Sequence, residues 1–271
     1  MKIFTVSEND RFRLSSTSKG NQIKWVNGGK FLKADTMGYE SIAEVLASEV
    51  ESVVNGINYV NYSLCLIQEG DLPVKYGCVS DLFTEQDESV ITMDRILTRY
   101  AGSDNSKKLL LKDLNGKELI SKIVNICSQM ISIPFDDIML YLSNIIKLDS
   151  IILNEDRHTN NISFIQCSNG SYRSAPVFDN GLSFLSDIQY YPFYTDLNTL
   201  MKRVCSKSFS TSFERQLDYF SDYPLLQIDC YKLFDRLDTY TVEFKKKEFE
   251  RSVSVLKHRL KLLKGVAWDN V

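Results

Sequence analysis

The sequence predicts an α+β protein of two lobes, a small, mainly β lobe over residues 1–82 and a mainly helical lobe over residues 83–271. Short runs with strand character dominate up to about residue 82, and helical periodicity dominates beyond it. A third observation is the polar stretch LNEDRHTNNISF, residues 153–164, which separates a long apolar helix from an apolar strand. A loop that only kept the protein soluble would not lead directly into a buried strand, so we expect this loop to be held rigidly.

The first lobe is expected to form a small sheet with one helix. RFRL, QIKWV and KFLKAD read as strands, and the Asn-Gly-Gly sequence at 27–29 is a strong hairpin signal between the last two. The runs YSLCLI (62–67) and VKYGCV (74–79) complete the sheet. Between KFLKAD and YSLCLI, residues 39–54 place apolar side chains on one helical face, and an Asn-Gly pair at 55–56 ends the helix.

The second lobe is expected to be mainly helical. Residues 116–131 and 134–153 have helical periodicity, and the second of these leads into the polar stretch. NISFIQ and APVFDNGLSF, separated by a turn at 168–171, predict a short hairpin that ends in a polar loop. Helices are expected from about 190 to 271, the longest over 241–263, and they carry no recognisable motif.

Composition excludes several classes of protein. A formal charge of -3, with acids and bases interspersed, argues against a general nucleic-acid binder, so DNA is not an expected direct partner. Six dispersed cysteines without a CxxC pair, and only two histidines, provide neither zinc spacing nor a redox pair. We find no signal peptide and no apolar run near the ~18 residues of a membrane span. A cytoplasmic protein with reduced thiols and no membrane partner is expected.

Three polar residues have the spacing of a phosphoryl-transfer site. Asp156 and Asn161 are five residues apart in one loop, and Asp179 follows in FDNG after the predicted hairpin. Two carboxylates and a carboxamide form the oxygen-rich set that Mg²⁺ prefers. Kinases use a catalytic Asp, an Asn five residues later and a metal-binding Asp in a later motif. Each residue alone could be a cap or turn residue, but their joint spacing favours a kinase.

NEDRHTNNISF together with APVFDNGLSF resembles the motifs of HipA-like serine/threonine kinases, in particular the short, single-kinase-domain members of the CtkA type. The loop is also similar to that of phosphoinositide kinases. The resemblance implies a bilobal protein-kinase-like fold in which Asp156 is the catalytic base and Asn161 and Asp179 bind Mg²⁺. It further implies that Lys33 contacts the nucleotide phosphates and that Glu44 pairs with it. The residues support this pair, because a lysine in an apolar strand needs a partner.

Other residues are expected to bind ATP. The stretch SSTSKGNQ, residues 15–22, has one glycine, so phosphate contacts would come from backbone amides, hydroxyls such as those of Ser16 and Ser18, and Lys19. Adenine is expected near the end of the last strand of the lobe, at Cys78, Val79 and Ser80. The resemblance also implies autophosphorylation within 15–18, with Ser16 and Ser18 the leading candidates.

The sequence therefore predicts an ATP- and Mg²⁺-dependent kinase that phosphorylates Ser or Thr of a protein, with an antitoxin-like regulator as a further possible partner. One alternative is a lipid or small-molecule kinase on the same fold, which the acidic pI of about 5.6 disfavours mildly. A second is a pseudokinase that binds nucleotide and acts as an interaction module. Arg157 is expected to bind a nearby carboxylate or carbonyl, and His158 to have a structural role in the loop.

Overall fold

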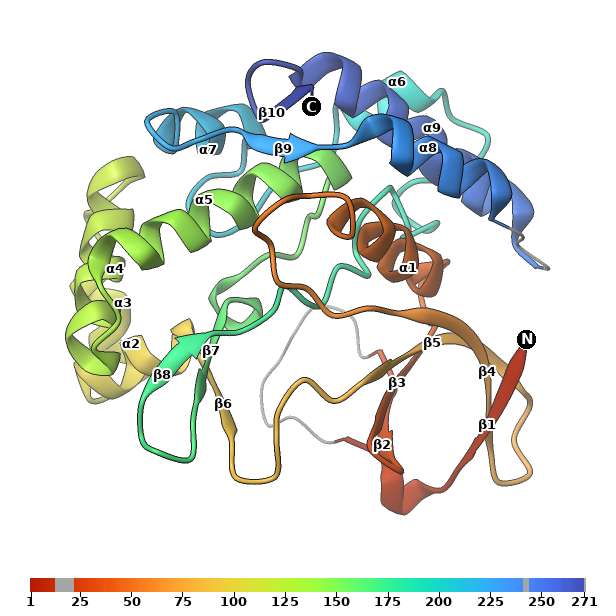
Figure 1. The fold of residues 1–271 in the computed structure, drawn as a ribbon, viewed down its shortest axis with the longest axis horizontal. Coiled ribbons are helices and arrows are strands. Elements are labelled where there is room, and N and C mark those ends of the chain that lie inside the picture. Colours follow the sequence, from red (N-terminus) through yellow and green to blue (C-terminus); the bar gives the residue numbers. More distant parts are fainter. Residues whose placement is uncertain (13–21, 241–243, 271) are drawn as a thin grey trace.

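The first lobe of the computed structural model, which describes residues 1–12, 22–240 and 244–270, is built on a curled five-stranded sheet (Figure 1). The strand order is β1-β4-β5-β3-β2, with β1 parallel to β4 and the other pairs antiparallel. The strands are β1 (Lys2–Val6), β2 (Lys24–Asn27), β3 (Lys30–Ala34), β4 (Ser63–Glu69) and β5 (Lys75–Asp81).

The β2–β3 hairpin sets the position of two lysines. Gly28 and Gly29 have φ of +56° and +75°, the left-handed values that a two-residue turn of type I′ requires. The turn aligns Asn27 with Lys30 and thereby places Lys24 directly opposite Lys33. Residues that are directly opposite in an antiparallel pair share one face of the sheet, so both lysines lie on the same face.

Helix α1 (Glu40–Glu51) connects the two lobes. It lies between the sheet and helices α8 (Cys230–Thr239) and α9 (Lys246–Leu263), as Figure 1 shows. With elements on both sides, nearly the whole helix is buried, including Glu40, Glu44 and Glu51. Buried carboxylates require hydrogen-bond or ion-pair partners. Helix α1 therefore contributes charged side chains held by specific partners as well as apolar packing.

The second lobe is mainly helical. One large core unites its helices with the inner face of α1. A three-stranded antiparallel sheet, β6-β7-β8, and a parallel pair, β9 and β10, complete it. The remaining elements are the strands β6 (Ser89–Thr92), β7 (Ser163–Gln166), β8 (Tyr172–Ser174), β9 (Leu226–Ile228) and β10 (Trp268–Asn270), and the helices α2 (Met93–Ala101), α3 (Asp104–Leu111), α4 (Gly116–Ile131), α5 (Phe135–Ile152), α6 (Leu197–Met201) and α7 (Phe213–Tyr219), with short 3₁₀ turns at Glu8–Asp10 and Thr159–Asn161.

The predicted α+β fold of two lobes is confirmed, and several element boundaries are corrected. The second strand of the predicted hairpin is β8, so the APVF run lies beyond it; this run has one isolated bridge, from Val177 to Tyr59. The parallel strand β1 and the three-residue strands β9 and β10 were not predicted. Half of RFRL, residues 13 and 14, lies outside the described residues, and Arg11 forms a bridge with Trp25. In the part of the chain that is described, every helix lacks the length or the apolar character that crossing a membrane requires.

Candidate active site

Lys33 on β3 joins the two lobes through two carboxylates. Its Nζ lies 2.5 Å from Glu44 Oε1 on α1 and 2.7 Å from Asp179 Oδ1, in the segment after β8. The residue is 1% exposed. Burial alone would lower the pKa of Lys33, but the carboxylates of Asp179 and Glu44 raise it well above its ordinary value. The ammonium group therefore stays charged at a buried position between the sheet, α1 and the Asp179 segment.

Asn180, next to Asp179, hydrogen-bonds to two buried carboxylates of α1, those of Glu44 and Glu51. Its backbone N–H donates to Glu44 Oε2 over 2.9 Å, and its side-chain Nδ2 donates to Glu51 Oε1 over 3.1 Å. Its Oδ1 accepts a hydrogen bond of 2.5 Å from Arg157 Nη2. The residue is fully buried. Asn180 thus holds the backbone next to Asp179 against α1, which fixes where the Asp179 carboxylate points.

Asp179 is held in a strained backbone conformation between two lysines. Its φ of +61° lies in the left-handed region, which non-glycine residues adopt at a cost that the surroundings must offset. Lys24 Nζ lies 3.3 Å from Asp179 Oδ2, opposite the contact from Lys33. Burial would raise the pKa of Asp179, but Lys24 and Lys33 outweigh it and the pKa is lowered far below its ordinary value. Sequence reasoning missed Lys24, although its position opposite Lys33 in the hairpin was a usable signal.

The polar loop after α5 is ordered by its own hydrogen bonds. Asp156 N donates to Asn154 Oδ1 over 3.0 Å, and Asn161 Nδ2 donates to the Asp156 carbonyl over 3.0 Å. Asn161 N donates to the His158 carbonyl over 2.8 Å. Because the Asn161 amide nitrogen is used in this way, its oxygen is the atom left for a ligand. The expectation of a rigidly held loop is met by this network.

The Asp156 carboxylate also contacts a lysine far away in sequence. Lys207, in the segment between α6 and α7, makes an ion pair with Asp156 Oδ1. His158 Nε2 lies 3.8 Å from the other oxygen, Oδ2. Sequence reasoning did not single out Lys207, because no motif surrounds it.

The structure places the predicted nucleotide-binding residues only in part. Ser16, Ser18 and Lys19 lie outside the described residues. Cys78, Val79 and Ser80 are on β5, opposite Lys33, Leu32 and Phe31 of β3. Cys78 and Ser80 are buried, and Val79 is half-buried. Their contact with adenine stays a prediction, as do the catalytic, phosphate and metal roles of Asp156, Lys33, Glu44, Asn161 and Asp179.

The chemistry of the donor set suits a hard divalent cation that is shared with a nucleotide. Within the described residues, no three or more His, Cys, Asp or Glu side chains are arranged to hold a metal ion by themselves. Asp179 is kept ionised, and Asn161 has a carboxamide oxygen available. Mg²⁺ is commonly bound by one or two protein oxygen ligands together with waters and substrate phosphates. The residues therefore fit Mg²⁺ that arrives with ATP better than a resident structural metal.

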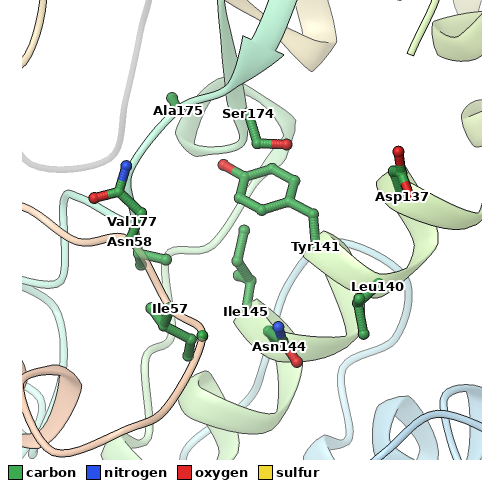
Figure 2. Close-up of a pocket in the computed structure, with 11 residues that line it drawn as sticks. Ile57, Asn58, Asp137, Leu140, Tyr141, Asn144, Ile145, Ser174, Ala175 and Val177 are labelled. Atoms are coloured by element: carbon green, nitrogen blue, oxygen red, sulfur yellow. The ribbon is translucent and has the colours of Figure 1, made fainter. Parts of the chain in front are cut away.

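A separate pocket of about 300 Å³ lies beside α5 (Figure 2). It is bounded by the 56–58 loop, by Tyr141 and Ile145 of α5, and by the chain that leaves β8 through Ala175 to Val177. The described members of the predicted site do not line it. Tyr141 is anchored there by a 3.2 Å hydrogen bond to the Ser163 carbonyl.

Comparison with known proteins identifies the fold. No family model and no curated protein matches the sequence. Among solved structures, the Helicobacter pylori proinflammatory kinase CtkA is similar with a TM-score of 0.64 and 16% identity, over 96% of this chain and 94% of that one. The HipA chain of a Shewanella oneidensis toxin–antitoxin complex with HipB and operator DNA matches with a TM-score of 0.42 and 11% identity, over 93% of this chain and 62% of that one. The likeness to CtkA shows that the chain has the bilobal kinase-like fold that its resemblance to HipA-like kinases implied.

Proposed function

We propose that this protein is a kinase that transfers the γ-phosphoryl group of ATP, with Mg²⁺, to a Ser or Thr hydroxyl of a protein. The observation that carries the proposal is the set of contacts around Lys33, which links β3, α1 and the Asp179 segment. The kinase-like fold and the adjacent Asp156–Asn161 loop support it. Phosphoryl transfer depends on positioning and on charge stabilisation more than on covalent chemistry by the protein, and these residues supply both.

Each residue of the candidate site has a separate proposed role in the transfer. Lys33 and Lys24 would neutralise the nucleotide phosphates, and Glu44 would hold Lys33 in place. Asn161 and Asp179 would hold Mg²⁺, which supplies charge neutralisation to the phosphate oxygens when it is bound. Asp156 would orient the acceptor hydroxyl and take its proton while the hydroxyl oxygen bonds to the γ-phosphorus and the bond to the ADP oxygen breaks.

The finer parts of the proposal come from the sequence resemblance. We propose autophosphorylation within residues 15–18, an antitoxin-like regulator, and adenine binding near Cys78 to Ser80. A phosphate adds about -1.5 to -2 charges and would repel the ATP phosphates and compete for lysines, so modification in 15–18 would lower activity.

Incubation with labelled ATP and Mg²⁺, followed by mass spectrometry of the protein and of an added cell lysate, tests the proposal. Label on Ser or Thr of a protein is the expected result. Label on lipid or on a small molecule would identify a different acceptor. Binding of ATP without transfer to any acceptor would identify a pseudokinase, and absence of ATP binding both with and without Mg²⁺ would remove the proposal.

A further inference from the structure

In the loop from Asp156 to Asn161, the proposed catalytic loop, Arg157 is not available to the transferred group. In the DRHTNN sequence, Arg157 is 2% exposed and its guanidinium is bound to Asp149 in the interior. Within the described residues, the basic side chains within ion-pair distance of Asp156 are His158, at 3.8 Å, and Lys207. Besides His158 of the loop itself, the cation beside the proposed base therefore comes from a different segment of the chain, through Lys207.

Lys207 lies in a loop that is held in place by hydrogen bonds and by packing against the core. The neighbouring Ser208 has a left-handed φ of +72° and donates a hydrogen bond from Oγ to the Arg157 carbonyl. Ser206 N donates to the Thr211 carbonyl over 3.0 Å, and Ser206 Oγ donates to the Ser210 carbonyl over 2.8 Å. Phe209 is 7% exposed and lies in the main core. Anchors on both sides of Lys207 thus hold it against the catalytic loop.

The charges in the site are arranged in two groups. Lys24 and Lys33 form ion pairs with Asp179, whereas Lys207 forms an ion pair with Asp156. The Lys207 side chain is 34% exposed. The Lys207 side chain is therefore not enclosed by the protein. The proposed base takes a proton from the acceptor hydroxyl, and this hydroxyl attacks the γ-phosphoryl group. A group that hydrogen-bonds to the base is therefore also within reach of the γ-phosphoryl group. In phosphoryl transfer, a cation next to the negatively charged equatorial oxygens of that group stabilises the transition state.

We propose that Lys207 is a further catalytic residue, which binds the γ-phosphoryl oxygens of ATP and stabilises the charge on the transferred group. The inference rests on the proposed kinase function. Lys207 pairs with Asp156 in the structure, and when ATP binds, its ammonium group bridges Asp156 and the γ-phosphoryl group. The competing role is inhibition, in which Lys207 occupies the base and must leave before a hydroxyl can enter.

The test compares Lys207→Met with Lys202→Met, an exposed lysine in the same connecting segment. Affinities for ADP and for a non-hydrolysable ATP analogue, both with Mg²⁺, are measured by calorimetry, and kcat is measured by transfer of label. Lys207→Met should lower kcat about 100-fold, in the range seen when one transition-state donor is removed. It should weaken the ATP analogue about tenfold and leave ADP unchanged, because only the analogue has a γ-phosphoryl group. Lys207→Arg should recover part of kcat, and Lys202→Met should match wild type.

Each other outcome has a defined meaning. Unchanged preference for the ATP analogue over ADP would overturn the proposal even if kcat fell, because Lys207 would then act only through Asp156. A higher kcat in Lys207→Met would overturn it in favour of inhibition. Retained ADP affinity and an unchanged melting temperature show that the variant is folded, and Lys207→Gln replaces it if they are lost. Wild-type protein that binds neither nucleotide would refute the kinase function itself, a result visible without any variant.

Discussion

Arg157 forms a two-point ion pair with Asp149, eight residues before it: Nε lies 3.0 Å from Asp149 Oδ2 and Nη2 lies 3.1 Å from Oδ1. The same guanidinium donates to the Phe178 carbonyl over 2.7 Å and to the Asn161 carbonyl over 3.1 Å. The expectation that Arg157 binds a carboxylate or carbonyl is confirmed. Because these contacts reach α5, the loop from Asp156 to Asn161 and the segment before Asp179, Arg157 fixes how the two candidate site segments lie relative to each other.

Replacing Arg157 by Ala should destabilise the protein by about 3–5 kcal/mol, because Asp149 would remain buried without its partner. Urea unfolding monitored by circular dichroism measures this loss. Arg173→Ala is the matched control, since its ion pair with Glu88 is at the surface and such pairs contribute about 0–1 kcal/mol. Equal, small losses in both variants would contradict the structural role of Arg157.

The sequence predicted those elements that are marked by turn residues or by the periodicity of neighbouring residues. The glycines at 28 and 29 predicted the hairpin, and periodicity predicted α1, α4 and α5. Strand β1 was missed because its apolar residues Ile3, Phe4 and Val6 do not alternate with polar ones, and of its residues only Val6 is buried. The strands β9 and β10 have three residues each, too few for an alternating pattern.

The candidate site was predicted where a motif fixes the spacing, as for Asp156, Asn161 and Asp179. Lys33 and Glu44 were placed by the resemblance and by the cost of an unpaired buried lysine, and the structure brings them into contact. Lys207 could not be found in this way, because it meets Asp156 across 51 residues and its position depends on the folding of the whole segment between α6 and α7. Long-range contacts of this kind leave no periodic or spacing signal.

Replacing Asp156 or Asp179 by Asn should leave the fold intact and reduce phosphoryl transfer by several orders of magnitude, because each change removes a group proposed to act on the reacting atoms. The two variants should differ in binding. Asp179→Asn should weaken Mg-ATP, whereas Asp156→Asn should mostly spare it. Label transfer and nucleotide titration measure the two effects. Turnover near the wild-type value in either variant would remove that residue from the mechanism.

Phosphopeptide mapping after incubation with ATP and Mg²⁺ should find phosphate within residues 15–18 of the wild type, first at Ser16 or Ser18. The Asp156→Asn variant should show none, because modification by the protein itself needs the proposed base. Stoichiometric phosphorylation should also lower the activity of the wild type. An enzyme that phosphorylates other substrates while residues 15–18 stay unmodified would exclude this form of regulation.

The C-terminal helices should be essential for stability even though they carry no motif. Leu256 of α9 is fully buried in the core that also contains Leu46 of α1 and Ile145 of α5. Leu256→Ala should cost about 2–5 kcal/mol of unfolding free energy, as is typical when a buried leucine leaves a cavity. Leu262, on the same helix, is 57% exposed, and its replacement by Ala should change stability by less than about 0.5 kcal/mol. Urea unfolding of both variants provides the comparison.

Glu51 should make the folded state less stable as the pH rises. Burial raises the pKa of Glu51 well above its ordinary value of 4.5; Arg157 opposes this effect and the carboxylate of Glu44 adds to it. Its Oε1 accepts from Asn180, but Oε2 is buried and has no hydrogen-bond partner among the described residues, an environment that favours the protonated carboxyl group. Above pH 4.5 the unfolded chain therefore releases the Glu51 proton while the folded chain retains it, and folding loses up to about 1.4 kcal/mol per pH unit until the folded pKa is reached.

Glu51→Gln replaces the titratable carboxyl group by an amide that does not titrate, and so provides the test. The amide keeps the shape of the protonated carboxyl group, and we expect its stability relative to wild type to increase steadily as the pH rises from 4.5 towards 7. Glu250→Gln, at an exposed position on α9, controls for the loss of one negative charge. Urea unfolding at four or more pH values supplies the free energies. A stability difference between Glu51→Gln and wild type that does not change with pH would contradict the prediction and show that Arg157 fully offsets burial. A difference that shrinks as the pH rises would show that Arg157 outweighs burial and that Glu51 is ionised in the folded protein.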